Sequence, residues 1–215
     1  NALLSMNPTS AWTLAATGSL TVSYANLRNC NASISQGTAS NTADQGSNTN
    51  WSYAMTWTGG GTDNNWFTGA NWGGGAAPTS TMSVLFDATS VKNVYLDGNV
   101  TLKAITLSPA YTGVFDFGST NFAVTGTADL RTGGTFAFSA SAQLEMAGTA
   151  AQTLYPKTGQ GLPNLRQSGA GGTTLAGGSL SAGNLNIAAG SLSEIFLTDG
   201  FKLGKIPLLA LPQSM

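Results

Sequence analysis

Residues 93–146 read NVYLDGNVTLKAITLSPAYTGVFDFGSTNFAVTGTADLRTGGTFAFSASAQLEM, and this stretch decides the fold. Within it, short triplets recur between glycines, each with an apolar residue on either side of a central one. Asp116 follows the central residue Tyr95 by 21 positions, and Ala137 follows Asp116 by 21. Two further series, spaced by 22 and 23, contain Thr101, Ala123 and Glu145, and Thr106 and Asp129. Three interleaved short strands with a period of 21–23 residues predict the coil of a β-solenoid.

The central residue of each triplet is expected to face outward, because successive side chains of a strand point to opposite faces. Three central residues are carboxylates, Asp116, Asp129 and Glu145, and each would cost on the order of several kcal/mol if buried unpaired. The flanking residues, Phe117 among them, should therefore form an inward column. No segment shows a sustained 3.6-residue apolar period, so the chain is expected to be all-β with almost no helix.

Composition excludes several classes of function. Only 8% of the 215 residues are charged, against roughly 25% in an average soluble domain. The formal net charge is −1 and the basic residues are scattered, so no nucleic-acid partner is expected. No apolar run approaches the roughly 20 residues of a membrane helix, which predicts no membrane insertion. The chain starts at Asn1 without a visible signal peptide, so we expect a fragment or a matured chain.

Cysteine and histidine usage limits the chemistry further. The chain contains no histidine and one cysteine, Cys30. This excludes a histidine-activated nucleophile, an intrachain disulfide and a cysteine-based zinc site, and we expect neither a metal nor a cofactor. Cys30 is interpreted as a small buried residue, with an intermolecular disulfide as the alternative.

Changes in composition and in the triplet pattern divide the chain into four parts. Residues 1–54 are expected to be terminal turns of a preceding β segment, and residues 55–90 a junction rich in tryptophan and glycine. Residues 91–192 are the solenoid repeat region, in which Leu165 and Asn186 are expected to continue the outward series beyond Glu145. Residues 193–215 form an atypical tail, either a cap or disordered. The polar stretch of residues 29–50 is either a loop or outer turns with an asparagine ladder.

The junction offers one candidate binding site. Four of the five tryptophans lie close together among glycines, at Trp51, Trp57, Trp66 and Trp72. Exposed rings of Trp66 and Trp72 beside Asn65 and Asn71 would stack on sugar faces, and a carbohydrate-binding module is therefore one hypothesis. The favoured interpretation is that the rings plug the start of the repeat region as a small core, because tryptophan buries a large area and usually finds a partner for its N–H.

The acidic residues allow two weaker hypotheses. Asp63-Asn64-Asn65 is the closest approach to a calcium loop, but the segment lacks further acidic ligands and the spacing of a known loop, which favours a plain Asx turn. Four aspartates would form the acid row of a glycan-active enzyme fragment, or simply solvated outward positions: Asp87, Asp97, Asp116 and Asp129. Glycosidase chemistry requires paired carboxyls roughly 5–10 Å apart. Because Asp116 and Asp129 belong to different face series, no catalytic residue is assigned and the chain is expected not to be an enzyme.

Three passages carry a resemblance: Tyr24–Asn29 running to Asn48–Trp51, Trp57–Phe86, and Gly183–Gly190. They resemble bacterial secreted parallel β-helix repeat proteins of the adhesin and autotransporter-passenger type. The resemblance implies a right-handed parallel β-helix and a non-enzymatic structural or adhesive role, extracellular or at the cell surface. The partners that it implies are surface glycans, host or cell-surface proteins, and neighbouring repeats of the same polypeptide.

Overall fold

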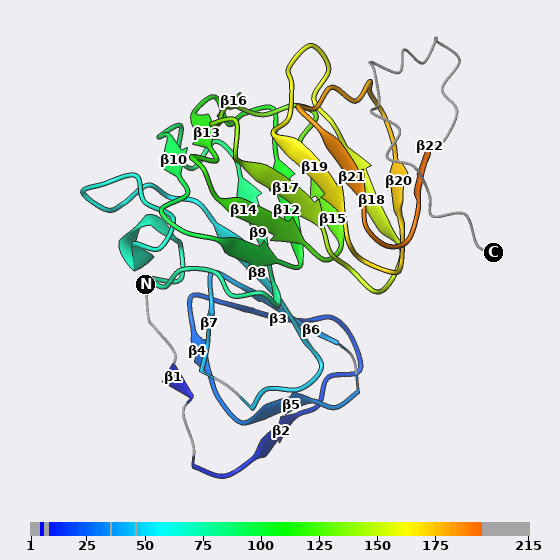
Figure 1. The fold of residues 1–215 in the computed structure, drawn as a ribbon. Helices are drawn as coiled ribbons and strands as arrows, with labels where there is room; N and C mark the ends of the chain where they lie inside the picture. Colours follow the sequence, from blue (N-terminus) through cyan, green and yellow to red (C-terminus); the bar gives the residue numbers. More distant parts are fainter. Residues whose placement is uncertain (1–4, 7–8, 35, 46, 195–215) are drawn as a thin grey trace, which may run out of the picture.

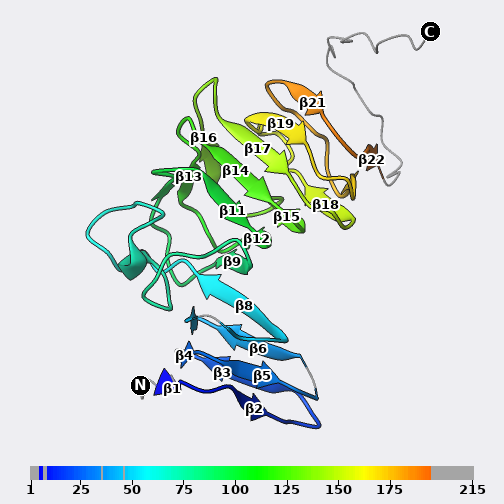
Figure 2. The same ribbon diagram turned by 60° about the horizontal axis from the view of Figure 1, so that its bottom comes forward.

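The computed structural model of this protein describes residues 5–6, 9–34, 36–45 and 47–194. These residues form a β-solenoid in which every pair of strands is parallel. The strands stack as rungs along one axis from β2 to β21 (Figure 2). Within the described residues, helix is limited to one 3₁₀ turn, η1 (Gly69–Asn71), so the all-β prediction is confirmed.

One face of the solenoid is a single nine-stranded sheet that runs its full length (Figure 1). In spatial order its strands are β3 (Leu20–Ser23), β6 (Gly37–Ser40), β8 (Trp51–Thr56), β9 (Met82–Phe86), β12 (Ala104–Leu107), β15 (Thr127–Asp129), β18 (Gln152–Tyr155), β20 (Thr173–Leu175) and β22 (Leu192–Glu194). The sequence predicts that residues 1–54 belong to a preceding β segment, but β8 and β9 pair directly, so the described strands before β9 belong to the same solenoid as the repeat region.

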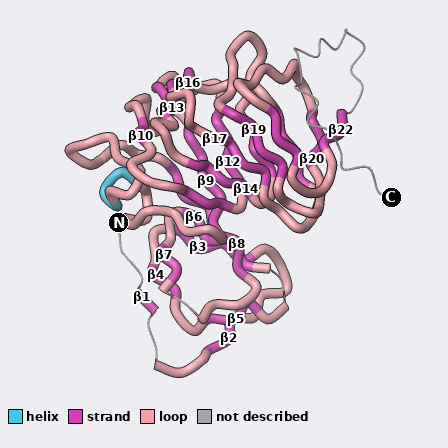
Figure 3. The backbone as a smooth tube through the Cα atoms, in the orientation of Figure 1, coloured by secondary structure: helices cyan, strands magenta, loops and turns pink. Residues whose placement is uncertain are grey.

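Shorter sheets close the other faces. A five-stranded sheet contains β11 (Val100–Leu102), β14 (Asn121–Val124), β17 (Gln143–Met146), β19 (Asn164–Gln167) and β21 (Leu185–Ile187). A three-stranded sheet contains β10 (Val94–Tyr95), β13 (Val114–Asp116) and β16 (Thr135–Ala137). At the N-terminal end, β1 (Ser5–Met6), β4 (Asn26–Leu27) and β7 (Ala43–Asp44) form one sheet, and β2 (Trp12–Leu14) and β5 (Cys30–Ala32) form another. Figure 3 shows that turns and loops connect these short strands at every corner.

The register of the middle coils confirms the predicted series. Tyr95 pairs with Asp116 and Asp116 with Ala137, and the other two series align in the same way. Phe117 is completely buried, as its inward position requires. Burial of this apolar column stabilises the fold by roughly 25 cal/mol for each Å² of apolar surface removed from water. Each coil supplies the surface on which the next one packs.

Two details of the predicted pattern are wrong. Glu145 pairs with Arg166, and Leu165 pairs with Leu144 in the buried column. A shift of one residue exchanges the two faces of a strand, so the outward series continues through Arg166 to Asn186. Phe138, a flanking residue expected to be inward, is 41% exposed because its sheet ends at β16 and no further strand covers it.

The described residues of the asparagine-rich stretch 29–50 form coils and not a long loop. These coils are short, because the chain soon returns to the nine-stranded sheet: Leu20 pairs with Gly37, and Gly37 pairs with Trp51. Asn48 donates to Leu27 O at 2.8 Å and accepts from Cys30 N at 2.9 Å, so its side chain joins adjacent coils. Cys30 is 1% exposed in this narrow core, which confirms its interpretation as a small buried residue.

Side-chain amides also follow one corner of the wider coils. They occupy equivalent places in five successive coils: Asn99, Asn121, Gln143, Asn164 and Asn184. Gln143 Nε2 donates to Asn121 Oδ1 at 3.1 Å, and Asn184 Nδ2 donates to Asn164 Oδ1 at 2.9 Å. These bonds satisfy polar groups at a position where the chain leaves one sheet and enters the next.

The predicted junction is an insertion between β8 and β9 that contains η1. Its Asn65 forms a parallel bridge to Tyr95, so the insertion lies beside β10. The predicted tail begins later than expected, since Ser193 belongs to β22, and residues 195–215 lie outside the described residues. Within the part of the chain that is described, no helix is long and apolar enough to cross a membrane.

Candidate functional site

The insertion places three tryptophans against the end of the aromatic core. Trp57, Trp66 and Trp72 are 0%, 0% and 2% exposed. The ring centroids of Trp66 and Trp72 are 4.6 Å apart and nearly perpendicular, and Trp57 stacks on Phe86 at 5.8 Å. Edge-to-face and offset contacts of this kind suit the aromatic quadrupole. Trp72 Nε1 donates to Trp66 O at 2.7 Å, which holds the two segments of the insertion together.

This burial corrects the predicted sugar-stacking role of Trp66 and Trp72. A stacking platform needs an open ring face, and these two rings turn both faces to protein. Trp66 also contacts Phe115 and Phe122 at centroid distances of 6.2 and 5.9 Å, so it covers the first aromatic layers of the wide coils. The favoured interpretation, a core plug where the repeat region begins, is confirmed.

The side chains of Asn65 and Asn71 form hydrogen bonds within the same insertion. The Asp63 carboxylate accepts hydrogen bonds from Asn65 N at 3.1 Å, Thr68 Oγ1 at 2.9 Å and Asn71 Nδ2 at 3.0 Å. Asn71 is fully buried, and its Oδ1 accepts from Gly61 N at 2.9 Å. The hydrogen bond from Thr68, followed by that from Asn65 N, holds the pKa of Asp63 below its ordinary value.

These contacts identify the Asp63 segment as an Asx turn whose carboxylate organises the loop. Asp63 is the single carboxylate in residues 57–81, and its oxygens are already engaged by donors of the loop. Hard cations such as calcium require several oxygen ligands. Among the described residues, no group of three or more cysteine, aspartate or glutamate side chains is arranged to hold a metal ion.

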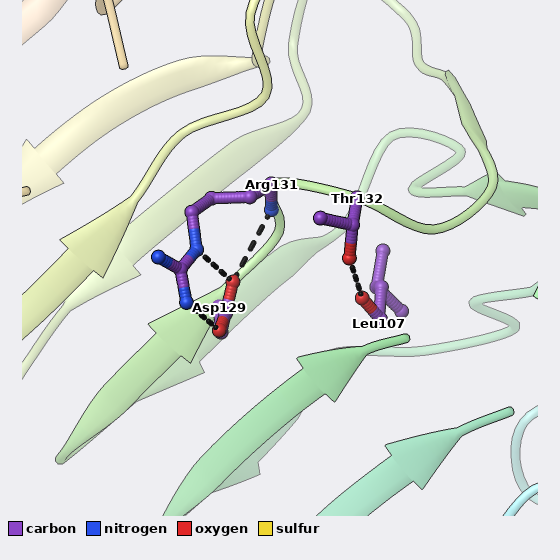
Figure 4. A network of polar contacts seen from close by, with 4 residues as sticks. All are labelled: Leu107, Asp129, Arg131 and Thr132. Atoms are coloured by element: carbon purple, nitrogen blue, oxygen red, sulfur yellow. Dashed lines mark hydrogen bonds and ion pairs between the residues drawn. The ribbon is translucent and has the colours of Figure 1, made fainter. Parts of the chain in front are cut away.

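The aspartates weighed as a catalytic row mainly organise corners. Asp87, Asp116 and Asp129 each accept a hydrogen bond from the backbone N–H two residues later, at 2.8, 2.8 and 3.3 Å. Asp129 also binds Arg131 through both carboxylate oxygens (Figure 4). The Arg131 guanidinium lies 4.0 Å from the centroid of the Tyr155 ring. Asx turns of this type end a strand and start a bend.

A more elaborate polar cluster surrounds Glu145, which is only 8% exposed. Its carboxylate accepts from Ser168 Oγ at 2.5 Å, Asn121 Nδ2 at 2.5 Å and Arg166 Nη1 at 3.1 Å. Burial alone raises the pKa of Glu145, but the hydrogen bonds from Ser168 and Asn121 and the charge of Arg166 outweigh it, so the pKa lies below its ordinary value. The ion pair between Glu145 and Arg166 has a signal in the sequence, because the two residues are one coil apart and therefore lie side by side on adjacent strands.

The nine-stranded sheet presents a continuous column of small uncharged side chains. In register order the column contains Ser23, Ser40, Ala54, Ser83, Ala104, Thr127, Thr153, Thr174 and Ser193. Adjacent members of the column lie on neighbouring strands, which are about 4.8 Å apart. Ser23 and Ser40 hydrogen bond to each other at 2.7 Å. The triplet pattern in the sequence does not reveal this column, because the coil length varies along it. Its members are aligned only by the register of strand pairing in the structure.

Comparisons with known proteins add no relative. Neither a protein-family model, nor a curated protein, nor a solved structure matches this chain.

Proposed function

We propose that this chain is a non-enzymatic structural or adhesive segment of a larger extracellular or cell-surface protein. The observation that carries the proposal is the outward column of the nine-stranded sheet. Hydroxyl and methyl groups repeat along it without a formal charge, so a partner meets the same weak contact in every coil. Weak contacts that act together give an avidity far above that of one contact.

Three further observations support a scaffold. Asp87, Asp116 and Asp129 each accept a backbone N–H at a corner through one carboxylate oxygen, which is a structural use of acids. The low charge content of 8% agrees with a surface whose polarity comes from hydroxyl and amide groups. The resemblance to bacterial adhesin-type repeat proteins points to surface glycans, cell-surface proteins and neighbouring repeats of the same polypeptide as partners.

A bead-retention assay under flow tests the adhesive role. The full chain is immobilised on beads and passed over surfaces coated with a neutral polysaccharide, an extracellular-matrix protein, or the chain itself. Retention on at least one surface is expected, together with no new reducing or unsaturated ends after incubation with soluble polysaccharide. Retention on none of the three surfaces, or cleavage of the polysaccharide, would overturn the proposal.

A charge-insertion pair locates the adhesive face. The double variant Thr127→Lys with Thr174→Lys places two like charges in the column and should reduce bead retention by about tenfold, an effect near 1.4 kcal/mol. The matched control is Thr101→Lys with Asn186→Lys, which places the same charges at exposed outward positions of the five-stranded sheet. Equal losses in both double variants would show that the column is not the adhesive face.

A further inference from the structure

Two exposed aromatic rings lie where the insertion meets β10, immediately beside the buried tryptophan plug. Phe67 is 48% exposed and Tyr95 is 45% exposed, although both flank fully buried aromatic and aliphatic residues. Leaving this much aromatic surface in water forgoes the favourable transfer that the rings next to them achieve. Other large apolar side chains are exposed singly, at Tyr24, Ile34, Val91, Phe138 and Ile187. Phe67 and Tyr95 differ from them because the bridge between Asn65 and Tyr95 brings two aromatic residues to one corner, and grouped exposed apolar surface marks an interaction site.

Glycines allow both rings to lie close to the backbone of the coil. The bridge between Asn65 and Tyr95 places Phe67 level with Asp97, and Phe67 N donates to Asp97 Oδ1 at 3.1 Å. A Cβ added to Gly98 would stand 3.0 Å from Phe67 Cε2, and one added to Gly118 would stand 3.1 Å from Tyr95 Cε2. Each ring thus rests over a position without a side chain, and the two rings cover consecutive coils.

Two carboxylates lie among these rings with their orientation already set. Asp116 is the register partner of Tyr95, and its Oδ1 accepts from Gly118 N at 2.8 Å. Asp97 lies two residues beyond Tyr95 and is held through Oδ1 by Phe67 N. Within the described residues, the Oδ2 atoms of Asp97 and Asp116 have no hydrogen-bond partner. A carboxylate is an acceptor only, so each free oxygen can receive an O–H from a ligand.

We propose that Phe67, Tyr95, Asp97 and Asp116 form a binding site for a neutral polysaccharide chain. The apolar C–H faces of two sugar residues stack on the two rings, and their hydroxyl groups donate to the free carboxylate oxygens. A cation would gain most in an enclosed, desolvated cage, whereas these rings are half exposed on an open corner. The carboxylates repel an acidic polysaccharide. The site is separate from the column of the nine-stranded sheet and does not depend on it.

Affinity chromatography of the full chain provides the test, on columns that carry an immobilised β-glucan, xylan or, as the acidic comparison, polygalacturonate. A neutral polysaccharide should retard the wild type. Phe67→Ala and Tyr95→Ala should each weaken the retardation constant about fivefold or more, in the range of one stacked ring, while Tyr95→Phe retains it. Asp97→Asn keeps the backbone contact of Phe67 and should weaken binding about two- to threefold, since one charge-assisted hydrogen bond becomes neutral.

Tyr24→Ala is the matched control, because Tyr24 is 49% exposed in the distant N-terminal coils. Three results would overturn the site: no retardation by either neutral polysaccharide, retardation by polygalacturonate alone, or an equal loss in Tyr24→Ala.

Nuclear magnetic resonance of the wild type provides a second measurement. Broadening of the Tyr95 and Phe67 ring-proton lines by tetramethylammonium and not by β-glucan would identify a cation site instead. This measurement also decides the question if an alanine variant does not fold. The Thr127→Lys and Thr174→Lys double variant should be retarded normally, so this site and the adhesive column can fail independently.

Discussion

The coils before and after the insertion use one architecture with two different interiors. Before it, several fully buried positions hold small residues, Ala32, Ala39 and Cys30, and the strands of successive coils lie close together in the sequence. After it, Phe115 and Phe122 fill the interior, and register partners such as Ala128 and Leu154 are separated by a longer circuit. Interior volume and coil length change together, because a longer circuit encloses a wider space that must be filled to protein density.

The corners of the two regions differ in the same way. Every described non-glycine residue with positive φ lies before the insertion: Tyr24, Asn29, Asn41, Ser47 and Asn50. After it, all described residues with positive φ are glycines. Asparagine tolerates the left-handed region and can bond across coils, as Asn50 Nδ2 does to Ala32 O at 2.6 Å. At a wide corner such as Gly134, the neighbouring backbone lies so close that a side chain would collide with it, so glycine is required.

The insertion lies where the narrow interior meets the wide one. A wide coil stacked directly on a narrow one would leave part of its aromatic layer uncovered. Trp66 covers that layer through its contacts with Phe115 and Phe122, and Asn65 extends the three-stranded sheet past β10. The plug acts as an internal cap, which repeat architectures otherwise need at their ends.

The largest expected effect comes from placing a charge in the wide interior. Phe117 contacts Phe115, Phe122 and Phe136 at centroid distances of 4.9–5.9 Å, so Phe117→Asp buries an unpaired carboxylate among rings. We expect a loss of at least about 4 kcal/mol and the melting of several coils. Far-UV circular dichroism and thermal melts measure it, with Thr101→Asp as the exposed control. An unchanged melt would contradict the inward position of Phe117.

Enlarging a residue in the narrow interior should cost less but still be harmful. Ala39 is fully buried between Val22 and Tyr53. Ala39→Leu adds three carbons to a coil without room for them, which should lower the free energy of unfolding by about 1–3 kcal/mol. In the wide interior, Ile105→Leu conserves volume and should cost less than about 1.5 kcal/mol. Urea unfolding of both variants checks the contrast, and a stabilised Ala39→Leu variant would mean that coil length does not limit the interior.

Exchanging the corner residues tests the second half of the comparison. Gly134 has φ +57°, and a Cβ there would stand 2.8 Å from Gly113 O, so Gly134→Ala should cost about 1–2 kcal/mol. Tyr24 has φ 52° at an exposed narrow corner, so Tyr24→Gly should change stability by less than about 0.5 kcal/mol or raise it slightly. Urea unfolding measures both variants. Similar costs at the two corners would remove the distinction between them.

The smallest effect concerns the Glu145 cluster. Because the pKa of Glu145 is lower in the folded chain, its contribution is present above the ordinary glutamate value of 4.5 and is lost as the pH falls through the folded value. Glu145→Gln should cost about 1 kcal/mol at pH 7, and this difference from wild type should shrink towards zero at acidic pH. Melts across pH 3–7 check it, with Asp87→Asn as the control. A difference independent of pH would argue against the charged pair.

Much of the fold was predictable because it depends on local alternation and on a constant period. The sequence assigns the triplets around Tyr95 and Asp116 to the correct face, since outward central residues and inward flanking residues follow from local alternation alone. The sequence places the series beyond Glu145 one residue out of register, because the coil length changes there and the true outward residue, Arg166, is fixed by its partner Glu145 in the preceding coil.

The sequence by itself therefore determined the parallel all-β solenoid, the inward column through Phe117 and the small buried character of Cys30. Only the tertiary structure decided the position of the tryptophans, since burial of Trp66 and Trp72 depends on how the insertion between β8 and β9 folds back on Phe86 and Phe115. The same packing left the neighbouring rings of Phe67 and Tyr95 in solvent. Alternation along a strand is a local property, whereas exposure at a corner depends on which distant segment covers it.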